Sequence, residues 1–370
     1  MINGPSLYYA TDKNIFDALN QSKVDAETIQ DMFRKRNIVC SRNTNREELA
    51  LFFSRLTHDL SDHRELSERL GVIPRKERVT SIDLYGKDIS PDILQRSADS
   101  LSDKLRHQGD IVQLSVEGSV MFIHIQYTII DYKKSEFSQL QHRTGVIELI
   151  RENGKLVIRS TKSDFIDGVR DDLARNIEHE VGAGLKRREI SLFHHPEHEK
   201  RSIFFYELMT SLPGYKIYDL TDVFVFKPRP TKAGSTASLL GTSDEEDEEN
   251  EDPYVEKIFL RGKGVSQSEL LAQLTEEKEY YIAKVGWIAT KSTGDGGRYQ
   301  MEATFADPAK CIGFSYMLRG VYDLDKNGKV QKNRRSPTAP EIDAVAKTIE
   351  LKAQDLVTLL DSGQLTGKKP

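Results

Sequence analysis

Five cationic side chains lie close together near the start of the sequence, where they could bind a polyanion. Arg34, Lys35, Arg36, Arg42 and Arg46 fall within 13 positions that contain no acidic residue. Cations on adjoining loops neutralise phosphate charges and make binding sensitive to salt. They are the candidate nucleic-acid-binding residues. Because positions 23–59 as a whole hold seven basic and six acidic residues, a module that binds protein and leaves these cations solvated is the alternative.

The residues around this cluster predict two helices joined by an extended crossing. Apolar residues recur at helical spacing from Ala26, the stretch 37–43 is extended, and a second helix covers about 45–56. This order resembles the SAP family of helix–extension–helix DNA-binding motifs, through Ile29, Met32, Phe33, Asn37-Ile38-Val39, Arg46 and 49–53. The resemblance implies that this module contacts DNA. Asn37 stands where the family usually has a glycine near the end of the first helix.

Two carboxylates and a lysine form a second pattern with catalytic potential. Asp110 begins one predicted strand, and Asp131-Tyr132-Lys133 ends the longer strand that follows. In metal-dependent nucleases, acidic residues hold Mg²⁺ and a lysine stabilises developing charge. Asp110, Asp131 and Lys133 are therefore the catalytic residues of an alternative, nuclease-like function. No other catalytic signature is present, and no cofactor is expected.

Three further motifs resemble metal or phosphate sites but lack essential members. His194-His195-x-x-His198 lies at a strand-to-helix junction without a complete local ligand set. Asp323-x-Asp325-x-Asn327-Gly328 has Arg334 where a calcium loop requires glutamate, so it is predicted to be a hairpin turn. Gly262-x-Gly264 lacks the rest of a nucleotide-binding fingerprint. No metal site is therefore predicted.

Composition limits the class of protein. The chain has 370 residues, 38% of them hydrophobic and 30% charged, which indicates a polar globular protein of two or three domains. No apolar run is long enough to cross a bilayer, and the two cysteines, Cys40 and Cys311, suit a reducing compartment. We therefore expect a cytoplasmic protein with no membrane partner. Eight acidic residues lie within 244–252, and without them the overall charge of −5 becomes +3.

The order of the predicted elements indicates an α+β fold. A small helical N-terminal module precedes a mixed or antiparallel sheet with packed helices, and an amphipathic helix over 338–360 ends the chain. Residues 1–15 show no usable period, and Glu152-Asn153-Gly154 predicts a hairpin. The predicted parts are a helical module (1–85), an α+β domain (86–228), a flexible acidic linker or insertion (229–254) and a second α+β domain (255–370).

These features together predict a non-catalytic binding or scaffold protein. We expect the N-terminal module to contact DNA and the α+β body to contact partner proteins. The alternatives are the nuclease-like enzyme and a subunit that binds only proteins.

Overall fold

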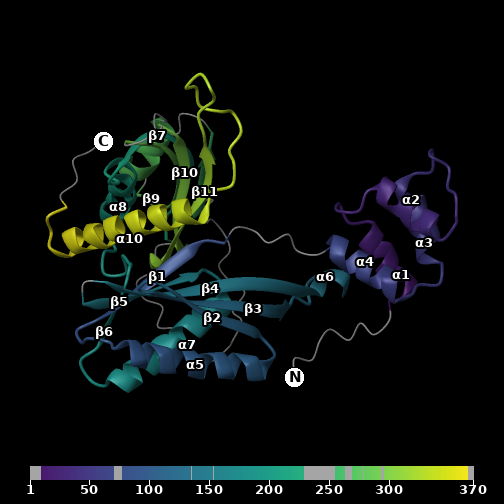
Figure 1. The fold of residues 1–370 in the computed structure, drawn as a ribbon. Coiled ribbons are helices and arrows are strands. Elements are labelled where there is room, and N and C mark those ends of the chain that lie inside the picture. The colour runs from purple at the N-terminus through teal and green to yellow at the C-terminus, as the bar shows by residue number, and fades with distance from the viewer. Residues whose placement is uncertain are drawn as a thin grey trace, which may run out of the picture. The chain divides into compact units, whose positions relative to one another are not determined.

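The structure is a computed structural model that describes residues 10–70, 77–134, 136–152, 154–228, 255–262, 269–277, 279–292 and 296–365. Its helices and antiparallel strands confirm the predicted α+β class (Figure 1). The chain divides into two compact units. The first comprises Met1–Arg75, Ile89–Leu149 and Gly168–Gly182, and the second comprises Lys76–Asp88, Ile150–Asp167 and Ala183–Pro370. No helix among the described residues is long and apolar enough to span a bilayer.

Both units are discontinuous in sequence, whereas the sequence analysis divided the chain into consecutive ranges. Strand β1 (Val79–Tyr85) lies within the range predicted to be a helical module (1–85), but it belongs to the second unit and pairs there with β5 (Lys155–Thr161) and β11 (Ile312–Tyr322). Local periodicity predicts a strand and does not identify its partner. The predicted linker 229–254, with its acidic run, lies outside the described residues, as does Asn153 of the predicted hairpin.

Four helices open the first unit and enclose a core of their own. They are α1 (Asp12–Leu19), α2 (Ala26–Lys35), α3 (Arg46–Ser54) and α4 (Leu60–Leu70). Side-chain oxygens of Thr11, Asp25 and Asn45 cap the first three, which satisfies backbone N–H groups that lack a helical partner. Helix α1 lies where the sequence showed no usable period, because its eight residues complete barely two turns.

The rest of the first unit is a layer of strands with two long helices. The strands are β2 (Ile111–Glu117), β3 (Val120–Ile130) and most of β4 (Leu140–Glu152), and the helices are α5 (Pro91–Gln108) and most of α7 (Asp164–Val181). Both helices lie on the same side of these strands (Figure 1). The short helix α6 (Glu136–Gln139) adds Phe137 to the core of the four-helix module. That contact joins the module to the strands within the first unit.

The second unit contains one long antiparallel arrangement of strands. Their order is β5-β1-β11-β10-β9-β7-β8, and β6 (Lys186–Glu189) also pairs with β1. The remaining strands are β7 (Tyr215–Phe226), β8 (Lys257–Arg261), β9 (Tyr281–Lys291) and β10 (Arg298–Asp307). The helices are α8 (His198–Thr210), the short α9 (Glu269–Ala272) with the π-helical turn η2 (Gln273–Glu277), and α10 (Ala339–Asp361). The C-terminal helix predicted over 338–360 is thus confirmed.

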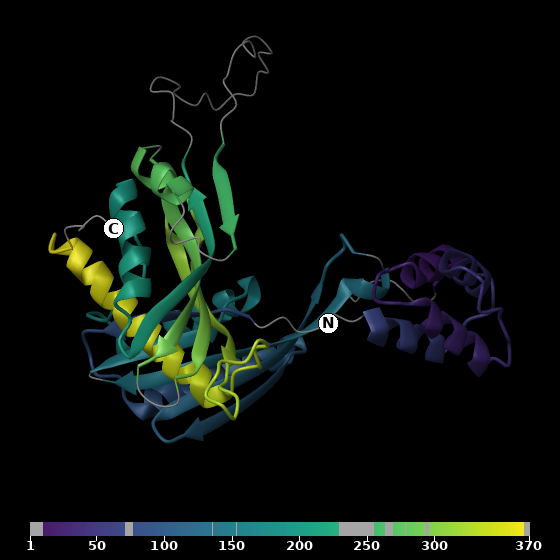
Figure 2. The same cartoon turned by 90° about the horizontal axis from the view of Figure 1, so that it is seen from above.

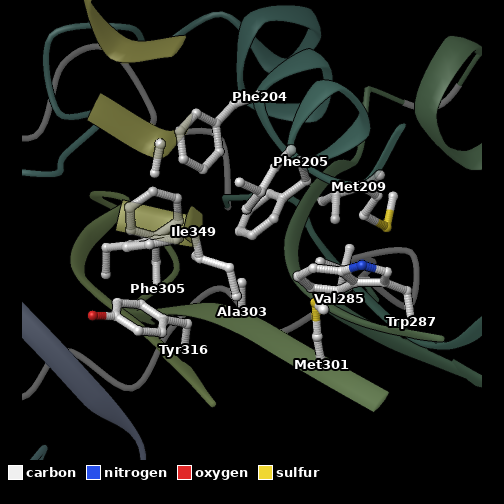
Figure 3. Close-up of a cluster of buried hydrophobic side chains, with 14 of the residues drawn as sticks. Phe204, Phe205, Met209, Val285, Trp287, Met301, Ala303, Phe305, Tyr316 and Ile349 are labelled. Carbon is white, nitrogen blue, oxygen red and sulfur yellow. The ribbon is translucent and has the colours of Figure 1, made fainter. Parts of the chain in front are cut away.

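Helices α8 and α10 lie on the same face of strands β7, β9, β10 and β11 (Figure 2). Phe204 and Phe205 of α8 meet Trp287 of β9 and Phe305 of β10 in a fully buried aromatic core (Figure 3). Successive side chains of a strand point to opposite faces. The residues that alternate with this core therefore point away from α8 and α10, and they form the opposite face.

Truncating the centre of this core should reduce stability strongly. We expect Phe204→Ala to lower the free energy of unfolding by about 3–5 kcal/mol, because a buried phenyl ring leaves a cavity. Tyr206→Ala on the same helix, where the side chain is exposed, should change it by less than about 0.5 kcal/mol. Urea denaturation of both variants checks the difference, and equal losses would contradict the packing described here.

Candidate nucleic-acid interface

Two of the five predicted DNA-binding cations hold the N-terminal module together. Arg36 Nη1 donates to the carbonyl oxygen of Thr57 at 2.6 Å, and its Nη2 pairs with Asp62. Its guanidinium also lies 5.0 Å from the centre of the Phe53 ring. Arg46 donates to the carbonyl oxygen of Leu19 at 3.0 Å. These bonds tie the end of α2 and the start of α3 to other parts of the module.

The other three cations are exposed around the crossing between α2 and α3. Arg34 pairs with Asp31 at 2.8 Å and Lys35 with Glu65 at 2.7 Å, while about three-fifths of each cationic side chain stays exposed. Arg42, in the crossing itself, is exposed as well. Surface ion pairs of this kind contribute little and exchange readily with other anions. The three cations are therefore available to a phosphate backbone.

Asn37 ends helix α2 with an unusual backbone conformation. Asn37 has a φ of 60°, in the left-handed region that glycine adopts most easily and asparagine tolerates. The amide of Ile38 donates to the carbonyl oxygen of Phe33 at 3.0 Å, which closes the end of α2. Asn37 thus ends α2 in a backbone conformation that glycine also adopts readily.

The structure does not bring the three residues of the nuclease alternative together. Ile111 pairs with Gln126, so by the same register Asp110 lies opposite Tyr127. Asp131 is four residues beyond Tyr127, which separates the backbones of Asp110 and Asp131 by about 13 Å along the strand direction. Ligand oxygens lie about 2.1 Å from Mg²⁺, so one ion cannot bind both carboxylates. Asp131 Oδ1 instead accepts a hydrogen bond from the amide of Lys133 at 3.1 Å. Burial raises the pKa of Asp110.

The rejected metal motifs serve as local structure. His195 Nε2 lies 2.9 Å from Asp361 Oδ1, and its carbonyl oxygen accepts a hydrogen bond from Arg201. Asp325 Oδ1 accepts from the amides of Asn327 and Lys329, which confirms the predicted turn. Across the part of the chain that the structure describes, no group of three or more His, Cys, Asp or Glu side chains could hold a metal ion.

The second unit has a charged surface opposite α8 and α10 that was not predicted from the sequence. Residues paired directly across antiparallel strands share a face, so the strand register defines rows of side chains. One row runs Arg261, Asp222, Gly286 and Glu302 across β8, β7, β9 and β10. We call this surface the charged face; its charged residues are Arg78, Lys216, Asp219, Asp222, Arg261, Lys284, Arg298, Glu302, Arg319 and Arg334.

Glu302 lies at the centre of the charged face and is fully buried. Arg78 Nε donates to Glu302 Oε1 at 2.7 Å, Lys284 Nζ lies 3.4 Å from the same oxygen, and Arg319 pairs with Oε2. Burial by itself would raise the pKa of this carboxyl, but the cations, Arg78 foremost, outweigh burial and lower it. Glu302 is therefore ionised and surrounded by three positive charges.

Arg319 bridges the two buried carboxylates of the charged face. Its Nη1 lies 3.5 Å from Asp222 Oδ2, while Nη2 contacts Glu302. The arginine occupies a bulge of β11, where the register with β10 shifts, and such bulges redirect side chains. Gly286 lies between the two acids in the row, and a Cβ atom there would meet Asp222 Oδ2 at 2.9 Å. The missing side chain makes room for this arrangement.

The charged face carries groups whose chemistry suits anions. Its two buried acids hold guanidinium and ammonium groups in place, and these groups are donors only. Two sequence signals could have revealed it: Lys284 and Glu302 each lie between two apolar residues of a strand, and Gly286 marks a close approach inside a strand. Neither signal identifies which charges meet.

Acidification should remove the stabilisation that Glu302 provides. Because its folded pKa is below the ordinary 4.5, the contribution is complete above that pH and is lost as pH falls below it. We expect the free energy of unfolding of Glu302→Gln to be about 3–5 kcal/mol lower than that of the parent protein at pH 7. Between pH 5 and pH 3 this free energy should change less with pH than it does in the parent protein. Urea denaturation at several pH values measures both, with the exposed Glu199→Gln as control; parallel pH profiles would contradict the assignment.

A methyl group at Gly286 should disturb the two acids. We expect Gly286→Ala to lower the free energy of unfolding by about 1–3 kcal/mol, since the added Cβ overlaps Asp222. Gly168→Ala in α7 is the matched control, because its Cβ meets nothing within 4 Å and should stabilise the helix by about 0.5–1 kcal/mol. Thermal unfolding compares the two, and a neutral Gly286→Ala would show that Asp222 has room to move.

A scan against protein-family models and a search of curated proteins found no match for this chain.

Proposed function

We propose that this chain is a non-catalytic nucleic-acid-binding protein whose N-terminal module contacts duplex DNA through Arg34, Lys35 and Arg42. One observation supports this: Arg36 and Arg46 hold the crossing in place, while Arg34 and Lys35 in the last turn of α2 and Arg42 in the crossing remain exposed. The crossing is thus a positioned cationic segment, which suits contact with a phosphate backbone.

The charge around the crossing favours an anionic partner over a neutral one. Residues 32–46 contain five cations and no acid, although acidic residues are frequent on either side of this stretch. Each phosphate that a cation neutralises releases counterions from DNA, so three contacts give a slope of about −2.7 for log affinity against log salt. Contacts to phosphates carry no sequence information, so we propose binding without strong sequence preference.

Salt titration of a labelled 20-base-pair duplex tests this function. We expect Arg34→Ala/Lys35→Ala/Arg42→Ala to weaken binding more than tenfold at 50 mM KCl and to reduce the salt slope by about 2.7. The control is Arg96→Ala/Lys104→Ala/Arg175→Ala, which removes the same charge from exposed positions on α5 and α7 of the same unit. Fluorescence anisotropy gives both quantities.

Two results would contradict the proposal. One is unchanged duplex binding in the first triple variant. The other is an equal loss in both triple variants, because a general effect of net charge would then explain the binding.

A further inference from the structure

We infer that the charged face of the second unit is a binding surface for single-stranded nucleic acid. This inference goes beyond the proposed function, since it concerns another unit and another form of the ligand. That face combines positive charge, cations held in place by buried acids and exposed aromatic rings.

Positive charge predominates on the charged face. Its seven cations and three acids leave a net charge of +4. Two of the acids, Asp222 and Glu302, are buried and engaged by cations, so they contribute little to the surface that a ligand meets. The cations lie above them: Arg261 is 72% exposed and Arg78 is 37% exposed. Such a surface attracts a polyanion.

The acids also fix the cations in place before any ligand binds. Arg78 uses Nε and Nη2 on Glu302, and Arg319 divides its two terminal nitrogens between Glu302 and Asp222. A guanidinium has five N–H donors, so both arginines keep donor capacity for a phosphate oxygen. Pre-positioned side chains lose less conformational entropy on binding, which favours the complex.

Exposed aromatic rings accompany these cations. Phe259 is 51% exposed and lies two residues from Arg261 on the same side of β8. Tyr218 on β7 is 54% exposed, and the guanidinium of Arg298 lies 3.3 Å from the centre of its ring. The rows that contain Phe259 and Arg298 are about 20 Å apart along the strands. Rings and cations thus cover a length that suits a short oligonucleotide.

This combination favours a single strand over a duplex. Bases stack on exposed aromatic rings only when they are unpaired, and stacking contributes about 1–3 kcal/mol per base. The bases of a duplex are already stacked, and its major groove admits a helix or a two-stranded ribbon, which is narrower than this sheet. An acidic peptide would use the cations but would not require Phe259 and Tyr218. A dependence of binding on Phe259 and Tyr218 therefore distinguishes a single-stranded nucleic acid from a duplex or an acidic peptide.

The test uses the full chain and a fluorescein-labelled dT12 oligonucleotide. The cation variant is Lys216→Ala/Arg261→Ala/Arg298→Ala, which leaves the three partners of Glu302 intact. Its control is Lys186→Ala/Lys200→Ala/Lys347→Ala, on β6, α8 and α10 of the same unit. We expect the cation variant to bind more than tenfold more weakly at 50 mM KCl, with a salt slope smaller by about 2. The control should bind like the parent protein.

The aromatic variant is Phe259→Ala/Tyr218→Ala, with Tyr206→Ala/Tyr85→Ala as its control. We expect the aromatic variant to lose tenfold or more in affinity while its salt slope stays unchanged, because stacking releases no counterions. Loss in the cation variant without loss in the aromatic variant would overturn the inference in favour of an acidic peptide or another polyanion. Failure of the parent protein to bind dT12 at 50 mM KCl would overturn it as well.

A tryptophan reporter provides a readout that does not depend on weakened binding. The chain has one tryptophan, Trp287, and it is fully buried. In Phe259→Trp, an added ring would lie on the charged face, and we expect dT12 to quench its fluorescence by stacking. Tyr206→Trp, on α8, should not respond. Equal responses, or none from Phe259→Trp at saturating dT12, would place the oligonucleotide elsewhere.

The two binding proposals can fail separately. The triple variant at Arg34, Lys35 and Arg42 should keep its affinity for dT12, and the cation variant of the charged face should keep its affinity for the duplex. If dT12 binding falls only in the N-terminal variant, the charged face is not the single-strand site.

Discussion

A carboxylate without access to water must be compensated by nearby charge, and Glu302 meets this requirement with cations from three separate stretches of chain. Arg78 lies just before β1, Lys284 lies on β9 and Arg319 on β11. Removing one partner of a buried ion pair destabilises a protein by far more free energy than a surface ion pair contributes to its stability. The central strand β10 is therefore held in its place in the strand order by charge as well as by backbone hydrogen bonds.

The same strands carry two kinds of chemistry on their two faces. Met301 and Ala303 of β10 belong to the aromatic and aliphatic core beneath α8 and α10, while Glu302 between them points to the charged face. Another buried acid, Glu350 of α10, is paired with Arg159 of β5 through two hydrogen bonds of 2.9 and 2.8 Å. Because each buried acid is matched, the unit can keep charges inside a largely apolar fold.

In both cationic surfaces, some charged side chains are held by bonds within the protein while neighbouring cations are exposed. In the N-terminal module, Arg36 and Arg46 hold the crossing and leave Arg34, Lys35 and Arg42 exposed. On the charged face, buried acids orient some cations while others reach solvent. The overall charge of −5 conceals both surfaces, because eight negative charges lie within 244–252 and the rest of the chain is at +3. Net charge alone is therefore a poor guide to what such a chain binds.

Local patterns determined many of the segments that become helices and strands, including β3 over Val120–Ile130 and the helix that follows Thr338, although they missed α1. They also placed five cations in one stretch, because neighbours in sequence stay neighbours in space. Only the tertiary structure decided that two of those cations bond to other parts of the module, and that Asp222, Lys284, Glu302 and Arg319 meet. The physical reason is that strand pairing and register, which bring distant residues together, depend on long-range packing and leave little trace in local sequence.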